Sequence, residues 1–212
     1  MLDLVNYFVR RWDLILDMTI QHLSVVLMAL SISIVIGVTI GFIITLNKTL
    51  ATITLSLVSM IMTVPSLALF SVMVPIFGVG SVPAIIGLVG YTQLPIIRNV
   101  YAGLMNIDPA VVDSARGMGL STGKIMYKIK IPLAMPVIFA GIRTAVVLGM
   151  GIAAIAAYIG AGGLGVMIFQ GINRANINMV MAGAIVISVL TIVVDRVLFY
   201  IQKRFELGGS AQ

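Results

Sequence analysis

Residues 108–136, DPAVVDSARGMGLSTGKIMYKIKIPLAMP, form one long polar and charged passage between segments that are otherwise strongly apolar. Asp108 followed by Pro109 predicts the start of a short helix. The carboxylate can accept hydrogen bonds from first-turn N–H groups, and proline's fixed φ suits the first helical position. Val111, Ala115 and Met118 fall on one face at helical spacing. These three residues give the helix an apolar stripe.

The second half of the passage predicts another short helix. Gly117 and Gly119 are expected to end the first helix or to let another backbone approach closely. Ser121 can cap the second helix, which we expect to stop before Pro132. The passage is thus predicted to be a compact helical hairpin, basic on its second arm at Lys124, Lys128 and Lys130.

Composition places the whole chain in a membrane. Of its 212 residues, 60% are hydrophobic and only 9% are charged, which predicts an all-α integral membrane protein with a single domain, 1–212. The net charge of +6 does not indicate nucleic-acid binding, because basic residues beside spans are expected anchors. The chain has no cysteine, and its one histidine, His22, lacks a partner for a metal site. His22 is expected at the membrane interface.

Five apolar segments are long enough to cross a hydrocarbon core, which takes roughly 20 helical residues. The second should be kinked at Pro65 and Pro75. Gly37 and Gly41 give the first a G-x-x-x-G face for close helix packing. The five predicted spans are residues 23–46, 50–77, 82–105, 137–158 and 179–200.

Residues 1–20 predict a helix that lies flat in the membrane interface, because apolar and polar residues occupy opposite faces at helical spacing. The apolar face is Leu2, Val5, Val9, Trp12 and Leu16, and the polar face is Asp3, Asn6, Arg10, Asp13 and Asp17.

The basic residues predict the orientation. If the spans simply alternate, most of the Lys and Arg residues in the connections fall on one side, which is then the cytoplasm. The C-terminus lies on that side, and the N-terminus lies outside. The residues concerned are Lys48, Arg116, Lys124, Lys128, Lys130, Lys203 and Arg204.

Two nucleotide-binding motifs are matched only in part. Gly160, Gly162 and Gly165 spell G-x-G-x-x-G, but a span precedes them and no βαβ unit surrounds them, so we expect a flexible external turn or a short re-entrant segment. Residues 119–125 come near a P-loop, but the first glycine is one residue too close and Ile125 replaces the Mg²⁺-binding hydroxyl. ATP hydrolysis is therefore expected on another chain. Because the sequence also offers no carboxylate pair, serine–histidine set or metal cluster, we expect no enzyme activity here.

Charged residues inside the predicted spans need partners or water, because burying a charge in lipid is costly. Asp195 is the only acidic residue deep in a span, about 12 Å from the cytoplasmic end, and Arg143 lies about 10 Å in at a similar level. We therefore predict an Asp195–Arg143 pair, with Arg98 as the second choice. Snorkelling of Arg98, Arg143 and Arg196 to the interface, or a role in gating or in lining a path, remains open.

The polar passage resembles the loop of membrane subunits of binding-protein-dependent ABC importers. The matching residues are Asp113-Ser114-Ala115, then Gly119, then Ile129, Ile131 and Pro132, with Asp-Ser where that family usually has Glu-Ala. Residues 131–144, IPLAMPVIFAGIRT, and 159–165, IGAGGLG, are similar to permeases for quaternary amines. The resemblance covers most of the chain from about residue 65 to 202.

This resemblance implies the partners and the site residues. Residues 108–135 would form a coupling loop in a groove of a cytoplasmic ATPase, through Asp113, Ser114, Ala115, Gly119 and Pro132. The glycine segment would lie at the outer mouth, facing a separate substrate-binding protein, through Gly160, Gly162, Gly163 and Gly165. The assembly in the cell membrane would be completed by two ATP-binding subunits and by a second permease subunit, identical or related. ATP and Mg²⁺ would bind to the ATP-binding subunits, and this chain would hold no cofactor or metal.

The substrate implied is a quaternary-ammonium osmolyte, namely glycine betaine, carnitine or choline. An importer of the same architecture for amino acids such as methionine is the first alternative. A channel or a membrane scaffold without transport activity is the second.

Overall fold

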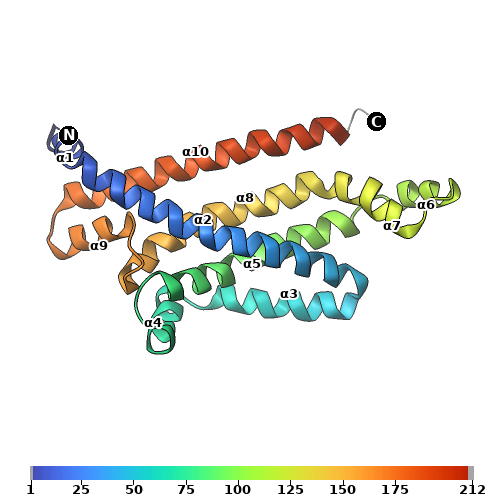
Figure 1. The fold of residues 1–212 in the computed structure, drawn as a ribbon, viewed down its shortest axis with the longest axis horizontal. Helices are drawn as coiled ribbons and strands as arrows, with labels where there is room; N and C mark the ends of the chain where they lie inside the picture. The colour runs from blue at the N-terminus through green and yellow to red at the C-terminus, as the bar shows by residue number, and fades with distance from the viewer. Residues whose placement is uncertain (1, 210–212) are drawn as a thin grey trace.

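The computed structural model describes residues 2–209, with side chains described up to Phe205, and this part of the chain consists of helices and short connections without a strand. The predicted all-α class is therefore confirmed. The long helices run side by side along the longest axis of the molecule (Figure 1). They are α2 (Trp12–Ile43), α5 (Ser81–Met105), α8 (Ile131–Ala156) and α10 (Ile177–Gly209). The shorter ones are α1 (Leu2–Arg10), α3 (Lys48–Thr63), α4 (Ser66–Phe77), α6 (Pro109–Gly117), α7 (Thr122–Ile125) and α9 (Gly165–Asn173), with a π turn at Met126–Lys130 and 3₁₀ turns at Ile44–Leu46 and Ala157–Ile159.

Helix α5 lies at the centre of the bundle and packs on α2, α3 and α8. Small residues allow the close approach of α2. A Cβ added at Gly37 would lie 2.7 Å from a side-chain carbon of Ile96, and one added at Gly41 would lie 2.6 Å from Val100. The predicted G-x-x-x-G packing face is thus confirmed, and each glycine fits a side chain of α5.

The predicted spans are only partly matched. Three helices are long and apolar enough to cross a membrane, at Trp12–Leu46, Thr122–Ile159 and Ile177–Phe205, or up to four if the bent pair α3–α4 counts as one. Helix α5 is not among them because Gln93, Arg98 and Asn99 lower its hydropathy, and it has less need to be apolar because other helices cover most of its surface.

The expected second span, 50–77, is two helices that meet at an angle of 94°. The break falls at Val64 and Pro65, both extended in ψ (129° and 130°). Proline disfavours helical backbone at the residue before it, and it has no N–H to continue the ladder. The kink predicted at Pro65 is present, but its size turns a single span into a bent pair. At Pro75, the other predicted kink, α4 continues as one helix to Phe77.

The predicted interfacial helix over residues 1–20 is too long. Helix α1 ends at Arg10, and residues from Trp12 onward belong to α2, which continues without interruption to Ile43. The reason is tertiary packing, since Ile15 is buried in a cluster with Leu164 and Met167 near α9. The exposed apolar residues Leu2, Val5 and Val9 all lie on α1, so the apolar face expected at the membrane interface is present on this helix.

The second arm of the polar passage also differs from the prediction. It does not stop before Pro132 but runs on from Thr122 through the π turn into α8. In that turn the N–H of Ile131 donates to the carbonyl of Met126, five residues back. The hydrogen-bond register therefore shifts just before Pro132, and the helix continues past the proline.

Candidate functional site

The helical hairpin α6–α7 projects from one end of the bundle, at the opposite end from the N-terminus (Figure 1). Its start follows the prediction, because the Asp108 side chain accepts a hydrogen bond of 2.9 Å from the N–H of Ala110 and Pro109 occupies the first turn. Ser121 occupies the N-cap position of α7, but its side chain makes no capping hydrogen bond. The local sequence around Asp108 therefore fixes where the first helix of the hairpin begins.

The hairpin has a small hydrophobic core of its own. Val112, Ala115 and Ile125 are buried together, with Leu120 and Ile129 packed against them. Of the three residues that share the apolar stripe of α6, only Ala115 is buried, whereas Val111 is 41% and Met118 is 72% exposed. The chain turns back over the other side of α6, so that α7 covers Val112 instead.

Gly119 makes that turn possible. Its φ is +80°, its N–H donates to the carbonyl of Arg116, and the N–H of Leu120 donates to the carbonyl of Ala115 at 3.1 Å. These two bonds form a Schellman motif, which places a left-handed residue just after a helix. A Cβ at Gly119 would meet nothing within 4 Å, so backbone conformation rather than crowding within this chain explains the glycine.

The side chains that remain available on the hairpin are polar. Asp113 and Arg116 form an ion pair of 3.4 Å with side chains 69% and 63% exposed, an arrangement that contributes little stability. Ser114 and Pro132 are also exposed. Ala115, which the sequence placed on the contact surface, is instead buried in the hairpin core, so its side chain cannot reach a partner.

Arg143 on α8 and Asp195 on α10 form a bidentate ion pair between the two helices. The Nη2 atom of Arg143 lies 2.8 Å from Oδ1 and 3.1 Å from Oδ2 of Asp195, and Nε donates to Oδ1 at 3.0 Å. Gln202 accepts from Nη1 at 2.8 Å, and the guanidinium lies 4.9 Å from the centre of the Phe199 ring. The pair predicted from the sequence is present, and Arg98, the second choice, takes no part in it.

The glycine segment 160–165 packs against the first long helix. Gly160, Gly162 and Gly163 have φ between +78° and +83°, and the N–H of Gly163 donates to Oε1 of Gln21 at 3.3 Å. A Cβ at Gly163 would lie 2.9 Å from the Cα of His22. The segment is therefore a turn that packs against α2 and leads into the short helix α9.

Close packing of this glycine segment explains the position of His22. The residue is only 1% exposed, so its side chain is enclosed by the protein. Its predicted level at the membrane interface stays a prediction. Nothing local in the sequence indicates this burial, because Gly163 is more than a hundred residues away along the chain.

A buried polar contact between α2 and α5 was also missed by the sequence analysis. The hydroxyls of Ser33 and Thr92 lie 2.7 Å apart, and Nε2 of Gln93 donates to the carbonyl of Ser33 at 3.4 Å. Polar residues within predicted spans are the signal that could have indicated it.

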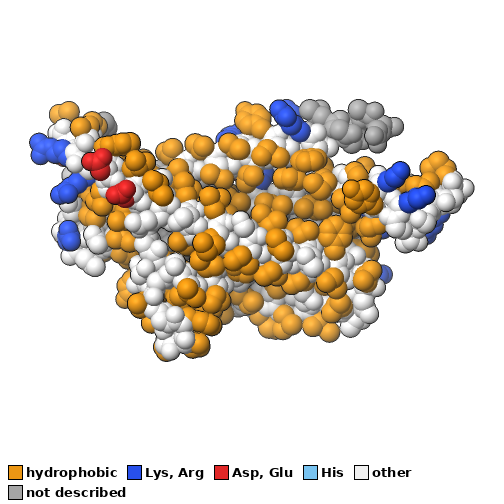
Figure 2. All heavy atoms as spheres, in the orientation of Figure 1, with side chains coloured by type: hydrophobic (Ala, Val, Ile, Leu, Met, Phe, Trp, Pro, Cys, Tyr) orange, Lys and Arg blue, Asp and Glu red, His pale blue; other side chains and the backbone are white. Residues whose placement is uncertain are grey.

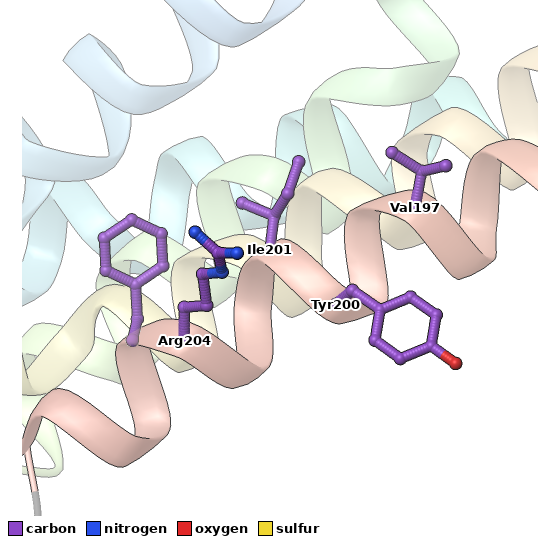
Figure 3. A pocket seen from close by; sticks show the side chains of 5 residues that line it. Val197, Tyr200, Ile201 and Arg204 are labelled. Atoms are coloured by element: carbon purple, nitrogen blue, oxygen red, sulfur yellow. The ribbon is translucent and has the colours of Figure 1, made fainter.

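Charged side chains gather at the two ends of the molecule, with a mostly hydrophobic surface between them (Figure 2). A shallow hollow of about 420 Å³ lies on the exposed side of α10, lined by an arginine and apolar or aromatic residues, but by none of the predicted site residues (Figure 3). Within residues 2–205, no group of three or more His, Cys, Asp or Glu residues could hold a metal ion.

An apolar all-helical bundle with a projecting polar hairpin defines a multi-pass membrane component. Residues 33–207 match the family described as the inner membrane component of binding-protein-dependent transport systems, and the chain belongs to this family. It is thus a membrane component of a transport system rather than a catalytic subunit.

Named relatives cover nearly the whole chain. The osmoprotectant import permease protein OsmW of Salmonella typhimurium is 40% identical over 95% of this chain and 96% of its own length. The carnitine transport permease protein OpuCB of Listeria monocytogenes is 37% identical over 95% of this chain and 92% of its own. The choline transport system permease protein OpuBB of Bacillus subtilis is 36% identical over 90% and 88%.

Solved structures show the same fold at lower identity. The MetNI methionine ABC transporter, in an inward-facing conformation, matches with a TM-score of 0.78 at 20% identity, covering 90% of this chain and 95% of that one. An amino acid ABC transporter matches with a TM-score of 0.78 at 19% identity, covering 92% and 96%.

Proposed function

We propose that this chain is the membrane-spanning subunit of an ATP-driven, binding-protein-dependent importer of quaternary-ammonium osmolytes: glycine betaine, carnitine or choline. The observation that carries the proposal is the identity of 33–40% to permease proteins named for osmoprotectants, carnitine and choline, over at least 89% of this chain.

The α6–α7 hairpin is the part that would contact the cytoplasmic ATPase. It projects from the bundle, and its exposed residues Asp113, Ser114 and Gly119 can reach a groove on another protein. Ala115 would act indirectly, since it packs the hairpin core. Two ATP-binding subunits would hold ATP and Mg²⁺, and this chain would need neither.

The hairpin end is proposed to face the cytoplasm. The start of α3, the hairpin and the end of α10 lie toward one end of the molecule, whereas α1 and α9 lie toward the other (Figure 1). The connections at the hairpin end carry more Lys and Arg than those at the α1 end, and an excess of these basic residues favours the cytoplasmic side. Lys and Arg side chains are visible at both ends of the molecule in Figure 2. The N-terminus and the glycine segment 160–165 would then lie outside, near the substrate-binding protein.

Transport would follow an alternating-access cycle. The three or four candidate spans and the enclosed helix α5 would not surround a path alone. A second permease subunit, identical or related, would complete it. ATP-driven closure of the ATPases would bring the two hairpins together, and the continuous helix from Thr122 to Ile159 would carry that movement through the membrane.

A second candidate function is import of methionine or a related amino acid. The methionine transporter has the same fold, but at 20% identity this likeness supports the fold alone and not the solute. The relatives of higher identity favour quaternary amines. A channel or scaffold without transport is disfavoured by the family match.

Uptake measurements test the proposal. The chain, its partner ATPase and its binding protein would be expressed in cells that lack other osmolyte transporters. Labelled glycine betaine, carnitine, choline and methionine would then be supplied separately. We expect ATP-dependent accumulation of at least one quaternary amine and no accumulation of methionine. Accumulation of methionine alone, or of no solute when all the subunits copurify, contradicts the proposal.

A further inference from the structure

The α6–α7 hairpin is joined to α8 through a π turn, which weakens the backbone of the helix at that joint. The turn spans Met126–Lys130, and the N–H of Ile131 donates to the carbonyl of Met126 instead of the carbonyl four residues back. Pro132 and Pro136 follow, and a proline has no N–H to donate to the preceding turn. Helices bend most readily at prolines and at π turns, and this joint combines the two.

The joint lies at the boundary between two hydrophobic cores. Ile125 and Ile129 pack in the core of the hairpin. Met126 and Ile131 pack against the main core of the bundle instead. All five residues of the π turn are exposed or half-buried, so neither core encloses the turn.

Beyond the joint, α8 is fixed to the central helix α5. Ala134 is fully buried, and a Cβ added at Gly103 of α5 would lie 3.3 Å from the Cβ of Ala134 and 3.2 Å from that of Val137. Helix α6, by contrast, packs mainly on α7. The hairpin and the bundle are thus two bodies, each packed within itself.

A hollow separates the hairpin from the bundle beside the joint. It has a volume of about 320 Å³, and its lining includes Val111 of α6, Ala102 of α5, and Leu133 and Val137 of α8. The short connection between α5 and α6, residues 106–108, also borders it. The hollow gives the hairpin room to tilt toward the bundle.

We propose that the π turn is a hinge at which the hairpin changes its angle to α8 when the ATPase subunits close. The inference rests on the proposed function, because it assumes that the hairpin binds an ATPase. Such a hinge lets the hairpin stay seated in its groove while the groove rotates. The start of α8 is then displaced without being bent along its length.

The extra residue of the π turn supplies the flexibility of the hinge. A π turn is an α-helix with one residue inserted, so the removal of one residue restores ordinary hydrogen bonds and keeps the packed faces on both sides in place. Lys128 is exposed, and its deletion therefore removes the shift in register without removing a packed side chain. Lys128→Ala removes the same side chain and keeps the register.

Cross-linking in the complex with the ATPase tests the movement directly. Because the chain has no cysteine, Val111→Cys with Leu133→Cys places one thiol on the hairpin and one on α8, across the hollow. Ala102→Cys with Val137→Cys is the matched control, because both residues line the same hollow but belong to the bundle. A short bifunctional thiol reagent would be added to the complex without nucleotide and to the complex trapped with ATP and vanadate.

We expect the yield of the intramolecular cross-link between hairpin and α8 to differ at least about fivefold between the two states, the lower end of typical coupling between sites. The yield for the control pair should be the same in both states. Equal yields for the hairpin pair, or equal changes in both pairs, overturn the hinge.

Uptake measurements test whether transport needs the hinge. Deletion of Lys128 should retain copurification of the ATPase and basal ATP hydrolysis, and should lower quaternary-amine uptake at least about fivefold. Lys128→Ala should match the wild type. Uptake at the wild-type rate after the deletion, or an equal loss of uptake in both variants, overturns the proposal.

The cross-linked complex decides the question if the deletion variant fails to assemble. The pair at Val111 and Leu133 should lose uptake when it is cross-linked, and each single cysteine variant treated with the same reagent should not. Normal uptake by the cross-linked complex overturns the proposal. A wild type that takes up no quaternary amine refutes the proposed function, whereas the cross-link yields do not depend on the solute and still decide the hinge.

Discussion

Replacement of Asp195 by alanine should destabilise the chain more than expected for the loss of one side chain, because it leaves a charge without its partner. The change removes three contacts of 2.8–3.1 Å between the carboxylate and Arg143. The guanidinium keeps only its bond to Gln202 and its contact with the Phe199 ring.

The expected cost follows from burial. Loss of one partner from a buried pair typically costs about 3–5 kcal/mol. Here the Arg143 and Asp195 side chains are 22% and 30% exposed, so solvent screens part of the interaction. We therefore expect about 2–3 kcal/mol for Asp195→Ala and a similar cost for Arg143→Ala.

The double variant should cost less than the sum of the two single changes, because it leaves no unpaired charge. We expect a coupling energy of about 1–2 kcal/mol, at the upper end of values measured for polar pairs in membrane proteins, which average about 0.6 kcal/mol. Asp195→Asn is the conservative control, because it removes the charge and keeps the shape.

Reversible unfolding of the purified permease in mixed micelles gives the four free energies of unfolding for this cycle. Recovery of the complex with its ATPase, measured on the same variants, reports assembly. Additivity of the two single changes to within about 0.3–0.5 kcal/mol would show that the pair is not coupled, and the reasoning would fail.

Three further predictions concern other parts of the chain. Gly119→Ala should destabilise the hairpin by about 1–2 kcal/mol and reduce copurification of the ATPase, because φ is +80° at this residue. Gly119→Asn should retain much of the binding, because asparagine tolerates that φ. Equal loss of binding in both variants would indicate close contact with a partner instead. In α8, Gly141→Ala should lower the free energy of unfolding by about 1–3 kcal/mol in a thermal unfolding assay, because the added Cβ would lie 2.5 Å from the Cβ of Asn99. Gly151→Ala is the matched control and should be neutral in the same assay, because its Cβ would meet nothing within 4 Å. Since the natural chain has no cysteine, Asn6→Cys should react with an impermeant thiol reagent on cells whose outer permeability barrier is removed, and Lys128→Cys only after lysis; the reverse pattern would invert the proposed topology.

Local sequence determined the features that depend on near neighbours. Asp108 and Pro109 predicted the start of α6 because a cap involves only the first turn of a helix. Pro65 marked the break between α3 and α4 because proline acts on its own backbone and on the preceding residue. Asp195 pointed to Arg143 because a lone deep carboxylate leaves few choices of partner.

Other features depended on which helices meet, and periodicity does not encode that choice. Val111, Ala115 and Met118 share a helical face, but the packed side of α6 became known only once α7 was seen to cover Val112. His22 is buried because a glycine segment far along the chain packs against it. The 94° angle between α3 and α4, likewise, was fixed by the packing of each helix on α5 and not by Pro65 alone.

The contrast between Arg98 and Arg143 separates the two kinds of information. The sequence shows that both lie within apolar segments, where a charge needs a partner. Only the tertiary structure shows that α8 and α10 give Arg143 its partners, whereas the helices around α5 cover three sides and leave Arg98 on the fourth. The physical reason is that hydropathy and spacing depend on the residues of one helix, whereas exposure depends on every helix packed around it.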